Sequence, residues 1–250
     1  MAEALLEVRQ LAKRFGGVVA TDNVSFEVQS GEVHAFIGPN GAGKSTLVAQ
    51  LAGSIAPDTG SIMFRSRDIS TLPQHERVRA GLARSYQVTS LFGRLSVLEN
   101  LALAVQAREG SSFSFWRPVA AERALDDEAR AFAAQVGLEA RLGVEARTLA
   151  HGEQRALEIA LALATRPRLV LLDEPMAGMG AEDSRHMIEL IERLRGQVTV
   201  LLVEHDMDAV FRLADRVSVL VNGRLIACDT PEAVRRDPEV RRAYLGELAA

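Results

Sequence analysis

Short apolar runs recur along the chain, and most have the length of a β-strand. Two runs near the N-terminus mix apolar with polar residues, whereas three later runs are almost wholly apolar, as in parallel strands that are covered on both faces. The pattern predicts strands at residues 5–8, 24–28, 33–37, 169–172, 198–203 and 217–221.

Between these strands, apolar residues recur at helical spacing. The pattern predicts a short helix at 47–52 and longer ones at 153–164, 181–195 and 206–214. Strands that alternate with helices are typical of an α/β fold with a parallel sheet.

The middle of the chain lacks the alternation of strands and helices seen in the rest. Residues 96–143 show no strand pattern, but Ala, Leu, Glu and Arg recur there at helical spacing, which predicts a helical subdomain. We expect a loop or hinge around 109–118, which contains Trp116, the only tryptophan. Its aromatic residues either pack locally or form an exposed patch for a partner or a membrane surface. The first interpretation is favoured, because apolar side chains are more often packed.

Composition narrows the function classes. The chain has 250 residues, 48% of them apolar, and a net charge of -4, which disfavours non-specific nucleic-acid binding. Its single cysteine, Cys228, excludes an internal disulfide. No apolar stretch approaches the ~20 residues of a transmembrane helix, and Glu3 and Glu7 interrupt any signal-peptide pattern. We therefore expect a cytoplasmic protein with no nucleic-acid partner.

A glycine-rich segment follows the predicted strand at 33–37 and precedes the predicted helix at 47–52. It fits G-x-x-x-x-G-K-[ST] in the strand–loop–helix context that this phosphate-binding motif requires. The glycines let backbone N–H groups turn towards phosphate oxygens, and the helix N-terminus adds positive charge. The lysine, one of only two in the chain, suits β- and γ-phosphates, and the serine hydroxyl suits Mg²⁺. The candidate ATP-binding residues are Gly38, Pro39, Asn40, Gly41, Ala42, Gly43, Lys44, Ser45 and Thr46.

Two carboxylates follow the apolar run at 169–172. Asp173 and Glu174 stand where a Walker B strand ends. There the first carboxylate belongs to the magnesium shell and the second acts as a base for water. This pattern is weak evidence alone and strong evidence beside a phosphate-binding loop.

Together these residues resemble the ATP-binding subunit of an ABC transporter, over residues 5–248. Five further features match in order and spacing. Phe15 resembles the aromatic residue that stacks on adenine, Gln87 the Q-loop glutamine that senses magnesium and γ-phosphate, and His205 the switch histidine. Residues 149–154, Leu-Ala-His-Gly-Glu-Gln, resemble the signature loop and are called the signature segment below; residues 177–180 occupy the D-loop.

The resemblance implies one ABC ATPase domain over residues 1–250. It has a P-loop NTPase core with a parallel sheet, an antiparallel β subdomain and an inserted helical subdomain. Residues 1–95 and 165–230 would form the core and the β subdomain, 96–164 the helical subdomain with the signature segment, and 231–250 a C-terminal helical tail.

The resemblance also implies site roles. Glu174, His205 and Gln87 would be catalytic, and Ser45, Gln87 and Asp173 would hold Mg²⁺. A second ATPase subunit would complete each ATP site with its own signature segment. This segment departs from Leu-Ser-Gly-Gly-Gln at Ala150, His151 and Glu153 but keeps Gly152, and Gly180 replaces the D-loop aspartate. We therefore expect that two subunits still enclose ATP at their interface but that this interface is weakened.

Within the family, the chain most resembles the ATPases of branched-chain amino acid importers. The sequences that carry this resemblance lie around Phe15 and at 149–152, 203–207 and 243–246. The ATPases of urea importers and lipopolysaccharide exporters look similar too. The implied partners are membrane permeases and, indirectly, a periplasmic or extracellular binding protein. The implied place is the cytoplasmic face of the inner membrane.

Two rival functions remain. A soluble ABC ATPase acting on DNA or the ribosome usually has a long coiled coil or two cassettes, and this chain has neither. A P-loop kinase needs an acceptor site and an arginine-bearing lid, and would not explain the signature segment.

Overall fold

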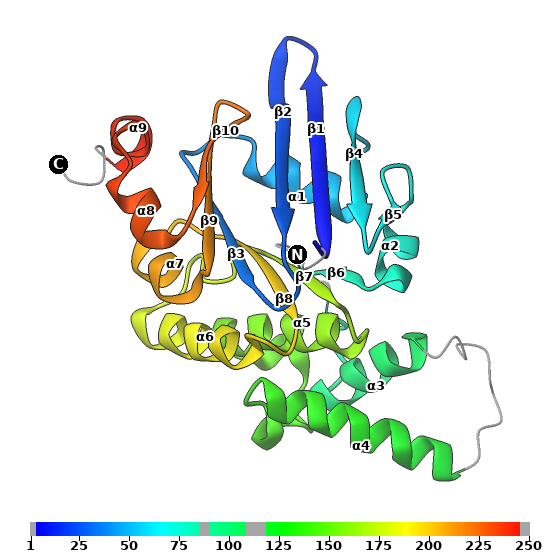
Figure 1. Ribbon diagram of the computed structural model, residues 1–250. Coiled ribbons are helices and arrows are strands. Elements are labelled where there is room, and N and C mark those ends of the chain that lie inside the picture. The colour runs from blue at the N-terminus through cyan, green and yellow to red at the C-terminus, as the bar shows by residue number, and fades with distance from the viewer. Residues whose placement is uncertain (1–3, 86–90, 109–118, 246–250) are drawn as a thin grey trace.

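The computed structural model describes residues 4–85, 91–108 and 119–245, which form two sheets with helices between and around them (Figure 1). The larger sheet has the order β10–β9–β3–β8–β7–β6, in which only β10 runs antiparallel to its neighbour. Its strands are β3 (Val33–Ile37), β6 (Leu82–Arg84), β7 (Leu169–Asp173), β8 (Thr199–Val203), β9 (Arg216–Val221) and β10 (Arg224–Asp229). Every residue of β3, β7 and β8 is buried, which explains their continuous apolar runs.

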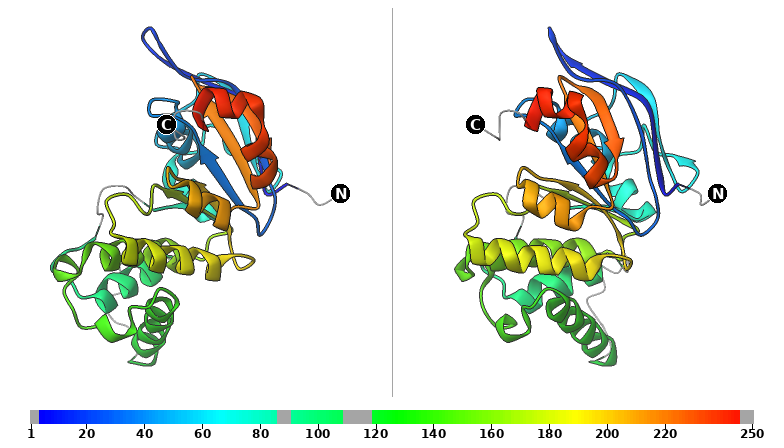
Figure 2. Two further views of the ribbon diagram at one scale, coloured as in Figure 1. Left: turned by 90° about the vertical axis from the view of Figure 1, so that its left-hand side faces the viewer. Right: turned by 60° about the vertical axis from the view of Figure 1, so that its left-hand side comes forward.

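The smaller sheet is antiparallel and has the order β2–β1–β4–β5. Its strands are β1 (Leu6–Phe15), β2 (Val18–Val28), β4 (Thr59–Phe64) and β5 (Arg67–Asp68). Gly16 and Gly17 turn the β1–β2 hairpin, which projects from one end of the molecule (Figures 1 and 2).

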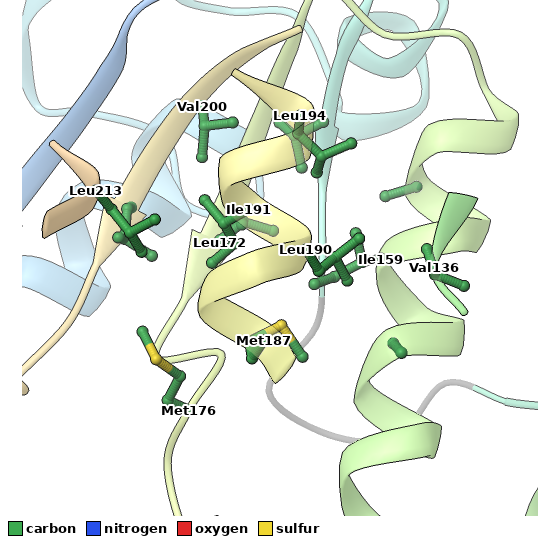
Figure 3. Close-up of a cluster of buried hydrophobic side chains, with 14 of the residues drawn as sticks. Val136, Ile159, Leu172, Met176, Met187, Leu190, Ile191, Leu194, Val200 and Leu213 are labelled. Atoms are coloured by element: carbon green, nitrogen blue, oxygen red, sulfur yellow. The ribbon is translucent and has the colours of Figure 1, made fainter. Parts of the chain in front are cut away.

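Helix α1 (Lys44–Ala52) packs between the two sheets, where Leu47 and Leu51 join a core with residues of β1, β3 and β8. The opposite face of the parallel sheet is covered by α5 (His151–Ala164), α6 (Ala181–Leu194) and α7 (Met207–Leu213). In Figure 3, Leu190 and Ile191 of α6 point towards Ile159 of α5 and Leu172 of β7. Both faces of the sheet are therefore sealed, and its strand ends remain for chemistry.

Helices α3 (Val97–Arg108) and α4 (Val119–Gln135) pack against each other and against α5, at the end of the molecule opposite the hairpin (Figures 1 and 2). Arg108 of α3 binds Glu128 of α4 through two hydrogen bonds of 2.7 Å. The remaining helical elements are α2 (Gln74–Ala80), α8 (Pro231–Arg236), α9 (Pro238–Val240), 3₁₀ turns at Glu139–Arg141 and Ala146–Thr148, and a π turn at Arg241–Leu245. Within the described ranges, no helix is long and apolar enough to span a membrane.

A buried arginine ties α2 to the end of α1. The guanidinium of Arg77 donates to the carbonyl oxygens of Gln50 and Leu51 at 2.7 and 2.8 Å, and also to those of Ser70 and Leu72. Gln50 and Leu51 lie in the last turn of α1, where a helix supplies few donors of its own to its carbonyl groups. Burial lowers the pKa of Arg77 to about 10, so the side chain remains charged at neutral pH and holds the helix that begins at Lys44.

The predicted fold class is confirmed: the molecule has a parallel α/β core, an antiparallel sheet and a helical region. The β1–β2 hairpin is longer than the predicted strands at 5–8 and 24–28, and α5 begins at His151 rather than at residue 153. The sequence pattern missed α2, β4, β5, β6 and β10. The proposed loop around 109–118 lies outside the described residues, and the subdomain boundaries stay a prediction.

Candidate nucleotide-binding site

The glycine-rich loop, the β1–β2 hairpin and two strand ends surround one cavity of about 320 Å³. The hairpin brings Phe15, which is 48% exposed. The ends of β7 and β8 bring Glu174 and His205. The lining residues are Phe15, Val18, Val19, Ala20, Asn40, Gly41, Ala42, Gly43, Lys44, Ser45, Thr46, Glu174 and His205. Most of the candidate residues therefore meet in one place.

Two glycines allow the loop to lie against neighbouring strands. A Cβ atom on Gly38 would lie 2.0 Å from the carbonyl oxygen of Leu220, and one on Gly43 would lie 2.0 Å from that of Ala20. Both residues also have positive φ, 150° and 103°. Only glycine fits this path, because backbone atoms occupy the space of any side chain.

Lys44 begins α1, and its side chain folds back over the loop. Its Nζ donates to the carbonyl oxygens of Gly38 at 2.6 Å and Pro39 at 3.0 Å. Burial lowers the pKa of Lys44, and the nearby charges of Glu174 and Asp173 partly offset this effect. The ammonium group is thus held at the cavity wall, where it suits a phosphate group.

The end of β7 places two carboxylates in different surroundings. Asp173 is fully buried, whereas Glu174 reaches the cavity from a left-handed backbone with φ of 49°. A non-glycine residue rarely adopts this conformation, and such strain is concentrated at functional sites. The Nε2 of His205 donates to Oε1 of Glu174 at 2.6 Å. This bond fixes the orientation of the one carboxylate that faces the cavity.

The two oxygens of Asp173 are not equivalent. Oδ2 accepts a hydrogen bond of 2.9 Å from Nη2 of Arg84, whereas Oδ1 is buried without a partner among the described residues. Burial raises the pKa of Asp173, and Arg84 opposes that rise. A buried carboxylate oxygen without a partner is costly unless a ligand completes it.

Three further residues support this region and were not predicted from the sequence: Arg84, Arg155 and Glu204. Arg84 binds Asp173, as described above. Arg155 of α5 donates to the carbonyl oxygens of Asp173 and Glu174 at 2.8 and 3.1 Å. Buried Glu204 accepts the N–H groups of Met176 and His205 at 2.8 and 3.0 Å, and burial raises its pKa. Arg84 and Glu204 directly follow apolar strand residues, and Arg155 lies in the first turns of a predicted helix; no motif marks any of the three.

The signature segment lies elsewhere. Ala150 is the N-cap of α5, and its N–H donates to Oε2 of Glu153 at 3.0 Å, while Nε2 of Gln154 donates to the carbonyl of Leu149 at 3.1 Å. Gly152 packs on Asp183 of α6. The helix start is therefore stabilised from within the chain, and Ala150 and His151 are exposed.

The structure thus brings most of the sequence-predicted site together. Ala150, His151, Gly152 and Glu153 do not line the cavity with Lys44; Gly152 and Glu153 border a different cavity, of about 310 Å³. Gly38 and Pro39 bind the lysine rather than line the cavity. Asp173 is fully buried and is not among the lining residues either. Gln87 lies outside the described residues, so its predicted role stays a prediction.

The sequence profile of the ABC transporter family matches residues 21–177. The chain belongs to this family. It is, accordingly, an ATP-binding subunit that hydrolyses ATP for transport. A second profile, described as branched-chain amino acid ATP-binding cassette transporter, matches residues 224–250.

Individual relatives agree with the family. The chain is 39% identical to the high-affinity branched-chain amino acid transport ATP-binding protein LivG of Escherichia coli K12, with 99% of this chain and 100% of LivG covered. It is 40% identical to the corresponding protein BraF of Pseudomonas aeruginosa, with the same coverage. Identity to the E. coli lipopolysaccharide export ATP-binding protein LptB is 36%, with 98% of each chain covered.

A solved ABC cassette shows the same architecture. The ADP conformation of MJ1267, an ATP-binding cassette of an ABC transporter, superposes with a TM-score of 0.85 at 29% identity, and the match covers 98% of this chain and 99% of MJ1267. The fold of this ABC subunit is therefore that of cassettes that bind nucleotide.

Proposed function

We propose that this ATPase energises the uptake of branched-chain or related amino acids through membrane permeases. The observation that carries the proposal is the match of residues 224–250 to a profile of branched-chain amino acid transporters. The identity of about 40% to LivG and BraF over nearly the whole chain supports it. LptB, at 36%, makes lipid export the second candidate.

In this proposal, the loop from Gly38 to Thr46 binds the phosphates of ATP, with Lys44 as the charged donor, and Phe15 stacks on adenine. Glu174 accepts the proton of the attacking water, and His205 holds the Glu174 carboxylate through the 2.6 Å hydrogen bond. The shared cavity and the strained backbone of Glu174 support these roles.

The residues present also suit a magnesium ion. Oδ1 of Asp173 has no protein partner within the described chain, and Ser45, whose side chain carries a hydroxyl, lines the cavity. Oxygen ligands of this kind are those that Mg²⁺ takes beside a phosphate. When bound, the ion would neutralise charge on the β- and γ-phosphates. Asp173, Ser45 and Gln87 would hold it.

A second ATPase subunit completes each site in this proposal. The P-loop cavity and the exposed start of α5 lie in separate places on one chain, so one chain cannot apply its signature segment to its own ATP. The start of a helix attracts phosphate through its free N–H groups and its dipole. The partner's signature segment would therefore close over the ATP bound at Lys44.

The permease partner has a suitable groove. Cavities of about 710 and 240 Å³ lie between α2 and the α3 and α5 helices, and share Gln74, Val78 and Thr165. We propose that the permease contact lies there and that the subunit lies on the cytoplasmic face of the membrane. A periplasmic or extracellular binding protein would act on the permease and would reach this chain only indirectly.

Reconstitution tests this function. The chain and its co-encoded permeases, placed in liposomes with their binding protein, should hydrolyse ATP faster when that protein carries leucine, and should accumulate leucine. The same complex with Glu174→Gln should accumulate none. Stimulation by urea or lipopolysaccharide, with no response to leucine, would contradict the proposed substrate class.

A further inference from the structure

The further inference concerns Arg84, the last residue of β6. Strand β6 pairs in parallel with β7, and Arg84 lies opposite Leu171, two residues before Asp173. Ser85 fixes this register, because its N–H donates to the carbonyl of Leu171 at 3.0 Å. The Arg84 side chain therefore extends along β7 to the carboxylate at its end.

The contact is enclosed. The Arg84 side chain is 13% exposed and that of Asp173 is 0% exposed, and Nη2 lies 2.9 Å from Oδ2. The neighbouring cations have other partners: Lys44 donates to loop carbonyls, and Arg155 donates to the backbone oxygens of Asp173 and Glu174. Arg84 thus fixes one oxygen of the carboxylate, and Oδ1 has no hydrogen-bond partner among the residues that the structure describes.

We propose that Arg84 is a positioning residue for magnesium: it holds Oδ2 of Asp173 and thereby presents Oδ1 to the ion or to one of its water ligands. The proposal rests on the assignment of Asp173 to the magnesium shell. Groups that orient a metal ligand typically contribute 10- to 100-fold to metal affinity. Arginine suits this role because its charge is permanent and its planar group has a fixed direction.

The alternative is that Arg84 only neutralises a buried charge. Breaking a buried ion pair destabilises the fold whether or not a metal binds. The two roles differ in one measurable ratio, the nucleotide affinity with Mg²⁺ divided by the affinity in EDTA. A positioning role changes this ratio, whereas a purely structural role changes folding stability or both affinities alike.

The test uses the full-length subunit with fluorescent mant-ADP, which avoids turnover, in Mg²⁺ or in EDTA. The variants are Arg84→Gln and Arg84→Lys. The control is Arg108→Gln, which breaks the ion pair with Glu128 away from the cavity; these two side chains are 19% and 20% exposed. Urea unfolding of each metal-free protein reports stability separately.

For Arg84→Gln, we expect the ratio of the mant-ADP affinity in Mg²⁺ to the affinity in EDTA to fall ~10- to 100-fold. The affinity in EDTA itself should stay near that of the parent. Arg84→Lys should lose less, and Arg108→Gln should keep the parent ratio. If Arg84→Gln does not fold, the ratio of Arg84→Lys decides. A folded Arg84 variant with the parent ratio, or with equal losses in Mg²⁺ and EDTA, overturns the proposal. A parent chain that gains nothing from Mg²⁺ would instead refute the magnesium assignment itself.

Discussion

The P-loop cavity and the signature segment show opposite designs. At and beside the cavity, Lys44, Glu174 and Asp173 are held by Gly38, His205 and Arg84, and Oδ1 of Asp173 has no partner in the described part of the chain. At the signature segment, Glu153 accepts the N–H of Ala150, and Ala150 and His151 are exposed. The first region is an enclosed cavity, and the second is an exposed helix start. This difference supports the proposal that one chain supplies two halves of two different ATP sites.

Of the substitutions that test the comparison between the P-loop cavity and the signature segment, Glu174→Gln should have the largest effect. Glu174→Gln should lower ATP turnover by ~10² to 10⁴-fold, because a base for water is lost, and should leave ATP binding intact. Lys44→Ala, in contrast, should abolish binding because phosphate charge is no longer neutralised. Filter binding and phosphate release on both variants check this. Rapid hydrolysis by Glu174→Gln would contradict the assignment.

The next largest effect is a difference in folding stability between alanine substitutions at two glycines of the P-loop. Gly43→Ala should cost about 3 kcal/mol of unfolding free energy, because its Cβ would meet the carbonyl of Ala20 at 2.0 Å. Gly41→Ala should cost only about 1 kcal/mol, since it has positive φ but no atom within 4 Å of the new Cβ. Urea unfolding without nucleotide measures both. Equal costs would mean that the close approach to β2 is not what requires glycine at position 43.

A third prediction concerns the departure from the family pattern at Ala150. Ala150→Ser should strengthen ATP-dependent dimerisation by ~1 to 3 kcal/mol, because the hydroxyl adds a hydrogen bond to the partner's γ-phosphate. Size-exclusion chromatography in the Glu174→Gln background measures it. Unchanged or weaker dimers would mean that His151 or the backbone already donates a hydrogen bond to the partner's γ-phosphate.

The smallest effect is expected at the start of α5. Glu153→Ala should cost about 1 kcal/mol of unfolding free energy, because the N–H of Ala150 loses its acceptor and Arg141 loses an exposed ion pair. Glu145→Ala is the control, since it removes only an exposed pair with Arg147 and should cost less than about 0.5 kcal/mol. Equal values for the two variants would show that Glu153 does not stabilise this helix start.

Contiguous motifs made much of this site predictable. The P-loop and the Asp173–Glu174 pair could be assigned because each motif lies within one strand end and its loop. The contact of Arg84 with Asp173 spans 89 residues, so only the pairing of β6 with β7 reveals it. Arg155 and Glu204 brace the site through main-chain groups of other segments, which a sequence pattern does not specify.

The fold was predictable to a similar extent and for similar reasons. Strands β3, β7 and β8 are buried on both faces, so their sequences are apolar throughout. Strands β4 and β10 are partly exposed and mix polar with apolar residues, which hides them. Strand β6 has only three residues, too few to show a period.

The dependence of ATPase rate on protein concentration tests the two-half-site account most directly. Association of two separate acidic chains costs entropy and repulsion, which permease partners offset by holding the ATPases together. For the isolated subunit, the rate should be slow and should rise faster than linearly with concentration, and it should become linear in the assembled transporter. A fast, strictly linear ATPase from dilute isolated subunit would contradict the account, because one chain would then contain a complete site.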